Sequence, residues 1–582
     1  PTWPGLDRIR AEGEEKIEKG HDPAEVLRWF GDLRPRTGIG AVRLAEALIA
    51  RGQPSLANDI IERAWLDIRL TDEGQEAILA AFGDVVEPLH NERVDGLLWR
   101  WRTEDAERML PLLDDDQRGL VEARLAYIQK SSDVEEKVAA VPEALRSEPG
   151  LAYDRYNWLA DRGERTQAVA LLRERSTDAA SLGEPFRWSG WRRSLARWEM
   201  GEGRPELAYD LASKHFLASG TSYADLEWIA GYVALTYLDQ QAVALAHFRA
   251  ARAAVTSPIS MSRMDYWTAR TLEEMDQPAE SAYRAAAQHQ TAFYGLLAAE
   301  KLGLSLDPSL TGVGDADDWQ GSAIMNDDLV RAALLLLEAG ERGAAVTFFV
   351  ELGKRLSADD LARIGAYLDQ KDESFFEVVI GKTAVTRDVL VPSNYFPVHA
   401  LAEMDLPVDA SLALAVARRE SEFNAVVGSA VGALGLMQLM PPTAEEVSGI
   451  LGESYSRPRL TSDWEYNARL GSKYLEILQD QFGPGPVMIA AGYNAGPSRP
   501  ERWMDERGDP RLGEVDVIDW IEHIPFRETR NYVMRVAESI PVYEARLTGE
   551  TGRIQFSKLL IGEKPLVRPE LRPATLNEPA TE

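Results

Sequence analysis

Apolar side chains recur every three to four positions over most of this 582-residue chain, which is the spacing of amphipathic helices. The periodic segments are short and alternate with turns that contain Gly, Pro or Asp, for example at 51–54, 201–205 and 275–278. Strand-like alternation is scarce. The pattern therefore predicts an all-α fold in which residues 1–310 form helical hairpins, and such hairpins usually stack into a superhelix.

Four tryptophans give the best internal periodicity of this first region. Trp158, Trp191, Trp228 and Trp267 are separated by 33, 37 and 39 residues, and spacings in the mid-thirties suit a unit of two helices. A stripe of tryptophans could stack against a glycan, but such residues more often fill the core between helices. We therefore predict that they are core residues.

Two segments rich in turn residues divide the rest of the chain. Residues 304–324 are rich in Gly, Asp, Ser and Pro, and residues 391–397 contain two prolines that do not fit inside a helix. The section between them has helical periodicity. The predicted domains are a superhelical domain at 1–310, a helical linker domain at 311–392, a catalytic domain at 393–548 and a proline-rich, partly disordered tail at 549–582.

A carboxylate occupies an unusual place in the third of these domains. After the candidate N-cap Asp409, apolar residues recur at helical spacing over 412–417, and Glu420 continues their stripe into the last turn of the predicted helix. Arg418 and Arg419 are predicted to point elsewhere. Partial burial and the negative end of the helix dipole would both raise the pKa of Glu420, as a proton donor near neutral pH requires. A solvated glutamate paired with a neighbouring arginine is the alternative, and this helix alone favours it.

Small residues and an amide follow this helix. The glycines of 428–435 allow a backbone to approach a ligand closely, and the absence of a following Gly-Lys-Ser/Thr excludes a phosphate loop. Residues 436–441 then place Gln438 between two methionines, a set that suits the faces and N-acetyl groups of amino sugars. A core strand or turn explains the apolar part equally well. Thr443 and Glu446 predict a capping box, and further helices are predicted at 464–482 and 486–494.

Three separate pieces of this region resemble the soluble lytic transglycosylases of bacterial cell walls. They are Arg-Glu-Ser-Glu-Phe-Asn at 419–424, Gly-Ala-Leu-Gly-Leu-Met-Gln at 432–438 and Pro-Pro-Thr-Ala at 441–444. Residues 491–497 and 520–533 match two further signatures, and 221–231 and 291–300 look like parts of the family's superhelix. The resemblance implies a lysozyme-like catalytic domain on a superhelix that closes into a ring. Ala425 and Leu434 depart from the residues that are usual in the family.

The resemblance also implies an activity and a set of site residues. The expected reaction is cleavage of the MurNAc-β-1,4-GlcNAc bond of peptidoglycan without water, which leaves 1,6-anhydro-MurNAc ends, with Glu420 acting first as acid and then as base. The expected location is the periplasm, with a signal peptide removed. Tyr532 is expected to hydrogen-bond near the acid, and the expected substrate-binding residues are Ser421, Ser429, Met437, Gln438, Met440, Tyr493, Asn494, Glu522, Glu528 and Tyr532. For Asn494 the alternative role is a helix C-cap, and for Glu528 it is a helix cap or a pair with Arg527 or Arg530.

The amino-acid composition limits the classes of ligand that the protein is expected to bind. The chain has 94 acidic residues against 64 Lys and Arg, a net charge of -30, which argues against nucleic acid and against a basic patch on anionic lipid. It has no cysteine, and its seven histidines show no metal-ligand spacing, so neither metal nor cofactor is expected. No run reaches the apolar length of a membrane span. The expected partners are peptidoglycan strands and, through the superhelix, proteins of cell-wall synthesis.

Two other functions compete with this interpretation. A lysozyme-like muramidase would use water instead of an internal hydroxyl, and it would need a second carboxylate, for which Glu528 is the candidate. A noncatalytic peptidoglycan-binding scaffold would need no acid on an apolar stripe. The intact segment at 419–438 argues against the scaffold.

Overall fold

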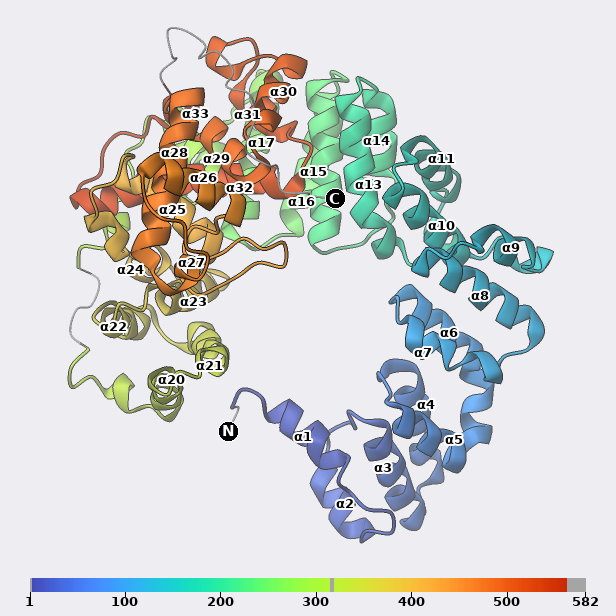
Figure 1. Cartoon of the computed structure of the whole chain (residues 1–582). Coiled ribbons are helices and arrows are strands. Elements are labelled where there is room, and N and C mark those ends of the chain that lie inside the picture. The colour runs from blue at the N-terminus through green and yellow to red at the C-terminus, as the bar shows by residue number, and fades with distance from the viewer. Residues whose placement is uncertain (1–2, 315–318, 563–582) are drawn as a thin grey trace. The chain divides into compact units, whose positions relative to one another are not determined.

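The computed structural model describes residues 3–314 and 319–562, and it confirms the all-α prediction (Figure 1). Within these residues no strand forms, and the only β-pairing consists of three isolated bridges. The internal contacts divide the chain into two compact units. The first comprises the residues up to Ala196 together with Asp210–Ser222, and the second comprises Arg197–Tyr209 and the residues from Tyr223 onward.

The first unit is a succession of short helices that pack on their neighbours in the chain. Thr37, Thr71 and Asp114 fix three of the helix starts, because each side chain accepts a hydrogen bond from a backbone N–H of the first turn. The core includes Trp65 and Ile61, which are fully buried. The helices are α1 (Leu6–Glu14), α2 (Pro23–Phe30), α3 (Gly38–Ala50), α4 (Pro54–Asp67), α5 (Asp72–Val86), η1 (Glu87–Leu89), α6 (His90–Trp99), α7 (Thr103–Glu107), η2 (Leu110–Leu112), α8 (Asp115–Gln129), α9 (Val134–Ala139), η3 (Glu143–Leu145), α10 (Pro149–Asp161), α11 (Arg165–Arg175) and α12 (Ala179–Leu182).

Three helices have residues in both units, and the second unit continues as helical pairs. The shared helices are α13 (Pro185–Gly201), α14 (Pro205–Ser213) and α15 (Thr221–Thr236). They are followed by α16 (Gln241–Ala253), α17 (Pro258–Glu274), α18 (Glu280–Ala287), α19 (Phe293–Lys301), η4 (Pro308–Thr311), η5 (Ala323–Asn326), α20 (Asp328–Glu338), α21 (Arg342–Arg355), α22 (Ala358–Asp369), α23 (Ser374–Val385) and α24 (Pro392–Tyr395). A separate hydrophobic cluster runs from Leu329 to Val391, inside the range predicted for the linker domain.

The four tryptophans do not share one environment. Trp228 and Trp267 are 1% and 2% exposed, and their ring centroids lie 5.9 Å apart, so these two are core residues as predicted. Trp158 and Trp191 are only half-buried. Arg162 lies over the Trp158 ring, and the indole N–H of Trp191 donates to Asp161 at 3.2 Å. The core prediction is therefore confirmed for the second pair, and Trp158 packs against a hydrophobic cluster that includes Tyr127, whereas Trp191 lies outside the buried core.

The C-terminal helices are organised around one long helix, α32 (Arg527–Thr548), on which α25 (Ala410–Ser421) and α29 (Pro486–Ala495) pack. The predicted helices at 464–482 and 486–494 are confirmed as α28 (Trp464–Phe482) and α29. The others are η6 (Ala400–Glu403), α26 (Pro441–Leu451), α27 (Arg459–Ser462), α30 (Ser498–Arg507), η7 (Pro510–Leu512), α31 (Val517–Glu522) and α33 (Phe556–Ile561). In the predicted tail, α33 is anchored by the buried Phe556 and Leu560, and 563–582 lies outside the described residues.

Across residues 3–314 and 319–562, no helix combines the length and the apolar character that crossing a membrane requires.

Candidate functional site

Glu420 lies in the last turn of α25, as the sequence predicts. The helix is built from small and apolar residues that are buried from Ser411 to Ala417, and it packs along α32. Asp409 is the N-cap residue as predicted, although its side chain makes no capping hydrogen bond. The position of the helix is therefore fixed by its buried face rather than by a side-chain cap.

The backbone turns sharply after Ser421. Glu422 and Phe423 both have left-handed backbone conformations, with φ of 53° and 66°, which cost free energy for residues other than glycine. Tertiary contacts hold this turn: the Phe423 ring is 5% exposed and stacks on His399 with centroids 5.3 Å apart. Glu422 pairs with Lys382. The helix thus ends where it leaves Glu420 at the edge of the packed interior.

The Glu420 carboxyl is half-buried and has one side-chain hydrogen bond, from the Tyr532 hydroxyl to Oε1 at 2.7 Å. Burial raises the pKa of Glu420 to about 7. The hydrogen bond from Tyr532 and the charge of Arg419 lower this pKa, while the charge of Glu528 raises it, and burial outweighs the rest. A carboxyl group with this pKa can both donate and accept a proton near neutral pH.

The two arginines that precede Glu420 differ in direction. Arg418 points away as predicted: its guanidinium lies 4.4 Å from the ring centroids of Tyr395 and Phe396 and donates to the Tyr395 carbonyl at 2.8 Å. The exposed Arg419 lies 5.9 Å from the ring centroid of Tyr532. Arg419 therefore points off the buried stripe as predicted, and it places a positive charge at the edge of the candidate site.

Four of the predicted residues take part in hydrogen bonds that hold the loop after α25 in place. The Ser421 hydroxyl donates to the Leu436 carbonyl at 2.6 Å, and the Tyr493 hydroxyl donates to the Met437 carbonyl at 2.8 Å. The Gln438 amide donates to the carbonyls of Val427 and Gly435. Ser421 is buried and Met437 is fully buried, so both hold the loop in place here, and their part in substrate binding stays a prediction. Gln438 and Tyr493 are half-buried and keep part of their surface open.

Asn467 on α28 is a positioning residue that the sequence reading missed. It is fully buried, its amide donates to the carbonyls of Leu434 and Leu460, and its carbonyl accepts from the Met437 N–H at 2.8 Å. A Cβ on Gly435 would lie 1.9 Å from the Leu460 carbonyl. Gly435 is therefore required for the loop to pack on the protein, and not for approach to a ligand as predicted. The available signal was a polar residue in the apolar stripe of the predicted helix at 464–482.

The helices α29 and α32 supply the other side of the site. The Thr529 hydroxyl donates to the Asn494 side-chain oxygen at 2.7 Å, which fixes the orientation of that amide. Gly496 is the C-cap residue of α29, so the alternative role of Asn494 as the C-cap is wrong. Glu528 is exposed in the first turn of α32, and its charge acts on Glu420. Sequence reasoning missed Thr529, which precedes Tyr532 by one helical turn.

Three remaining predictions concern residues away from the acid. Ser429 is exposed, and its hydroxyl accepts from the Ala433 N–H, which closes a turn. Met440 is half-buried and is the N-cap residue of α26. Because α26 begins with two prolines at 441 and 442, Thr443 lies inside the helix and the predicted capping box is wrong.

Glu522 is an internal residue, and its part in substrate binding stays a prediction. Its side chain is fully buried and accepts hydrogen bonds from Arg197 at 3.1 Å and from the Tyr294 hydroxyl, and it pairs with Arg263. Burial alone would raise the pKa of Glu522, but the charges of Arg263, Arg197 and Arg530 lower it to about 2. This carboxylate links α31 to α13, α17 and α19 within the second unit.

A search for metal ligands adds nothing to this site. Among the residues that the structure describes, no group of three or more His, Asp or Glu side chains is placed to hold a metal ion.

Comparisons with known proteins find relatives of the region that contains Glu420. Residues 400–512 match the family model of the transglycosylase SLT domain, which includes Glu420, Gln438, Tyr493 and Asn494 but ends before Tyr532. The soluble lytic murein transglycosylase of Escherichia coli is 30% identical over 276 residues, which are 47% of this chain and 42% of that protein. The matched stretch thus spans less than half of the relative's length.

Two solved structures share the fold over nearly the whole chain. The 70 kDa soluble lytic transglycosylase Slt70 of Escherichia coli superposes with a TM-score of 0.64 and 20% identity, covering 96% of this chain and 87% of that one. An inactive Glu-to-Gln mutant of lytic transglycosylase Slt from Pseudomonas aeruginosa has a TM-score of 0.63 and 21% identity, covering 94% and 91%. Residues 400–512 are therefore similar to a transglycosylase SLT domain, and the chain shares its fold with the two solved lytic transglycosylases.

Proposed function

We propose that this chain is a peptidoglycan lytic transglycosylase, which cleaves the MurNAc-β-1,4-GlcNAc bond without water. The observation that carries the proposal is the Glu420 carboxyl, half-buried, bonded by Tyr532 and with a pKa of about 7. The name of the Escherichia coli relative supports the substrate, and the inactive Glu-to-Gln mutant of the Pseudomonas aeruginosa protein supports a glutamate in the reaction.

Glu420 serves in two proton transfers in this proposal. In its neutral form it donates a proton to the glycosidic oxygen, and the C1–O bond breaks while the sugar's own 2-acetamido oxygen stabilises C1 as an oxazolinium ion. The resulting carboxylate then takes the proton of the C6 hydroxyl of the same sugar. The C6 oxygen attacks C1, which restores the acetamido group and gives the 1,6-anhydro end. Glu420 finishes protonated, and no water is consumed.

The surroundings of Glu420 suit this sequence of steps. Burial disfavours the carboxylate, so about half of the molecules hold the proton at pH 7. The Tyr532 hydroxyl stabilises the carboxylate that the first step creates, since its hydrogen bond lowers the pKa. Gln438, Tyr493 and Asn494 are the half-buried polar residues that we propose bind the sugar, with Thr529 and the Met437 carbonyl setting the directions of two of them.

A muramidase is the second candidate, and one observation favours it. Glu528 is a second carboxylate whose charge acts on Glu420, and a hydrolase would need such a group to activate water. Against it, Glu528 is exposed, whereas the substrate-assisted route needs only Glu420. The transglycosylase is therefore the better-supported of the two.

The masses of the released fragments decide between these reactions. We expect purified peptidoglycan treated with the protein to give disaccharide peptides with anhydro ends, each lighter by one water than the reducing product of a muramidase. Reducing products alone would establish the muramidase. An absence of soluble fragments, with the protein still bound to the glycan, would establish the noncatalytic scaffold.

Replacing Tyr532 with Phe should move the pH dependence of turnover. Without the hydrogen bond that stabilises the carboxylate, the pKa of Glu420 rises further, so the alkaline limb of kcat/KM shifts upward by about one pH unit. Tyr474→Phe is the matched control, because Tyr474 is a buried tyrosine of the same domain whose ring lies against Tyr493 instead. Identical alkaline limbs in the two variants would rule out the role of Tyr532.

The proposed reaction also implies a location and partners for the protein. We propose that the protein acts in the periplasm, where peptidoglycan is accessible, and that glycan strands are its main partner. The ring closure of the superhelix, the domain boundaries and the binding of cell-wall synthesis proteins stay predictions from the resemblance. Fractionation of cells, with activity recovered in the periplasmic extract, tests the location.

A further inference from the structure

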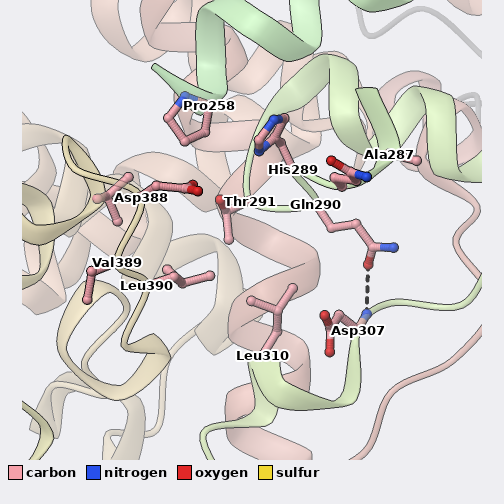
Figure 2. A pocket seen from close by; sticks show the side chains of 12 residues that line it. Pro258, Ala287, His289, Gln290, Thr291, Asp307, Leu310, Asp388, Val389 and Leu390 are labelled. Atoms are coloured by element: carbon pink, nitrogen blue, oxygen red, sulfur yellow. Dashed lines mark hydrogen bonds between the residues drawn. The ribbon is translucent and has the colours of Figure 1, made fainter. Parts of the chain in front are cut away.

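A cavity lies outside the SLT domain match. It is formed within the second unit where the connection between α18 and α19, the start of η4 and the segment after α23 come together (Figure 2). Its volume is about 220 Å³. This is smaller than the roughly 300–1,000 Å³ of pockets for drug-sized ligands, so its occupant must be small.

The polar side chains that face this cavity have unused hydrogen-bonding capacity. Thr291 is 9% exposed, yet its hydroxyl makes no hydrogen bond to any residue that the structure describes. In Figure 2 the carboxylate of Asp388 is turned toward Thr291, and His289 lies on the same wall. Neither Asp388 nor His289 has a hydrogen-bonded or ion-paired side chain within the described ranges. Thr291 as a residue is nine-tenths buried while its hydroxyl keeps accessible surface, so a ligand in the cavity would supply the hydrogen-bond partner that the hydroxyl lacks among the described residues.

The charge of the cavity has one sign. Asp307 and Asp388 line it, and no lysine or arginine does. Arg252, whose charge reaches His289, is already held by both oxygens of Asp265 at 3.0 Å. Burial lowers the pKa of His289, so its imidazole is neutral at pH 7 and offers a nitrogen acceptor.

Hydrogen bonds among residues that line the cavity hold one of its sides in place. The Gln290 carbonyl oxygen accepts from the Asp307 N–H at 2.7 Å, and Asp307 in turn accepts from the Ser309 N–H at 2.9 Å. The remaining walls are apolar and come from Leu310, Val389 and Leu390. The cavity therefore combines acceptors at one end with an aliphatic surface beside them.

We propose that this cavity binds a small aliphatic primary amine in its ammonium form. The three N–H donors of an ammonium group match the Asp388 carboxylate, the Thr291 hydroxyl and the His289 ring nitrogen. The alkyl part lies against Leu310 and Val389. A metal ion fits less well, because the acidic and histidine side chains among the described residues are nowhere grouped in threes for coordination.

Three four-carbon probes of similar size test this proposal on the full chain. Saturation-transfer NMR and calorimetry with n-butylammonium, n-butanol and butyrate separate the effect of charge from that of apolar contact. We expect binding of n-butylammonium only, about tenfold weaker in Asp388→Asn, and also weakened in Thr291→Val. Equal binding of the alcohol and the ammonium would overturn the proposal.

Asp372→Asn is the matched control for the charge. Asp372 and Asp388 are both exposed aspartates with left-handed backbones after a helix, with φ of 57° and 65°, and asparagine is tolerated in that conformation. Only Asp388 lines the cavity. Equal loss of n-butylammonium binding in both variants would show a general charge effect and would contradict the site. Unchanged turnover on peptidoglycan is expected in either variant, so this result is independent of the reaction proposed for Glu420.

Discussion

Glu420→Gln is expected to abolish turnover while the protein stays folded. A glutamine can neither donate the proton to the glycosidic oxygen nor take one from the C6 hydroxyl. General acid–base catalysis contributes about 10²–10⁴-fold in most enzymes, and one residue serves both steps here, so we expect a loss at the upper end of this range. Release of soluble fragments from purified peptidoglycan measures it.

The same variant should be more stable than the parent protein in alkaline solution. The pKa of Glu420 is raised from 4.5 to about 7, so the folded protein binds this proton more tightly than the unfolded chain does. The stabilisation is complete below pH 4.5 and is lost as the pH rises through 7. A shift of this size corresponds to about 3 kcal/mol, a penalty that a neutral glutamine avoids at pH 8. Urea unfolding at pH 5 and pH 8 should show the variant gaining stability relative to the parent only at the higher pH.

Glu422→Gln provides the matched control for both measurements. Glu422 is two residues away at the end of the same helix, but it pairs with Lys382 on another helix. We expect nearly full turnover in this variant and a small change in stability, since pairs near the surface contribute little. Turnover by Glu420→Gln close to that of Glu422→Gln would refute the assignment of Glu420.

The features that could be predicted from the sequence are those that local patterns determine. Apolar periodicity and breaking residues placed α28 and α29 almost to the residue. The raised pKa of Glu420 was predictable because the apolar stripe from Leu412 to Ala417 indicates that the Glu420 side chain points toward the buried face of the helix. Burial is the largest cause of the shift. A helix-terminal residue that continues a buried stripe is half-buried whatever lies across from it.

The contacts that could not be predicted from the sequence involve partners far away along the chain. Met437 belongs to a signature segment, but whether it faces a ligand or the core is decided by α28, thirty residues later, where Asn467 binds its backbone. Glu522 is separated by 325 positions from Arg197, and no local pattern announces that pairing. A residue in a signature segment can position a site through packing instead of contacting substrate itself. A residue's side-chain type therefore indicates its chemistry, while its role depends on three-dimensional neighbours.

Glu522→Gln is expected to destabilise the folded protein by about 3–5 kcal/mol, the usual result of removing one partner from a buried charged cluster. Arg197, Arg263 and Arg530 surround this carboxylate and lower its pKa from 4.5 to about 2. The stabilisation is therefore present above pH 4.5 and is lost only as the pH falls through 2. Urea unfolding at pH 7 measures the effect. A variant as stable as the parent would show that the arginines do not depend on this carboxylate.

Glu538→Gln is the control that separates lost charge from altered packing. Glu538 is also buried, and it accepts a hydrogen bond from the Phe293 N–H at 2.7 Å, but burial raises its pKa to about 7. A glutamine oxygen can accept the same bond, and its neutrality relieves the penalty of a buried charge above pH 7. We therefore expect Glu538→Gln to be neutral or stabilising at pH 8, where Glu522→Gln is costly. Two buried glutamates with opposite pKa shifts should thus respond oppositely to one substitution.

A double-mutant cycle with Arg263→Met measures the coupling between Glu522 and Arg263. Arg263 pairs with Glu522, and its guanidinium lies 3.5 Å from the ring centroid of Trp228, so its loss alone should also destabilise the protein. Because the charge in each single variant is left without its partner, the double variant should lose less than the sum of the two, with a coupling of about 1–3 kcal/mol. Additive losses would mean that Glu522 and Arg263 contribute through separate contacts. The helix α31 would then be held to α17 by packing, and not by the charge that the carboxylate supplies.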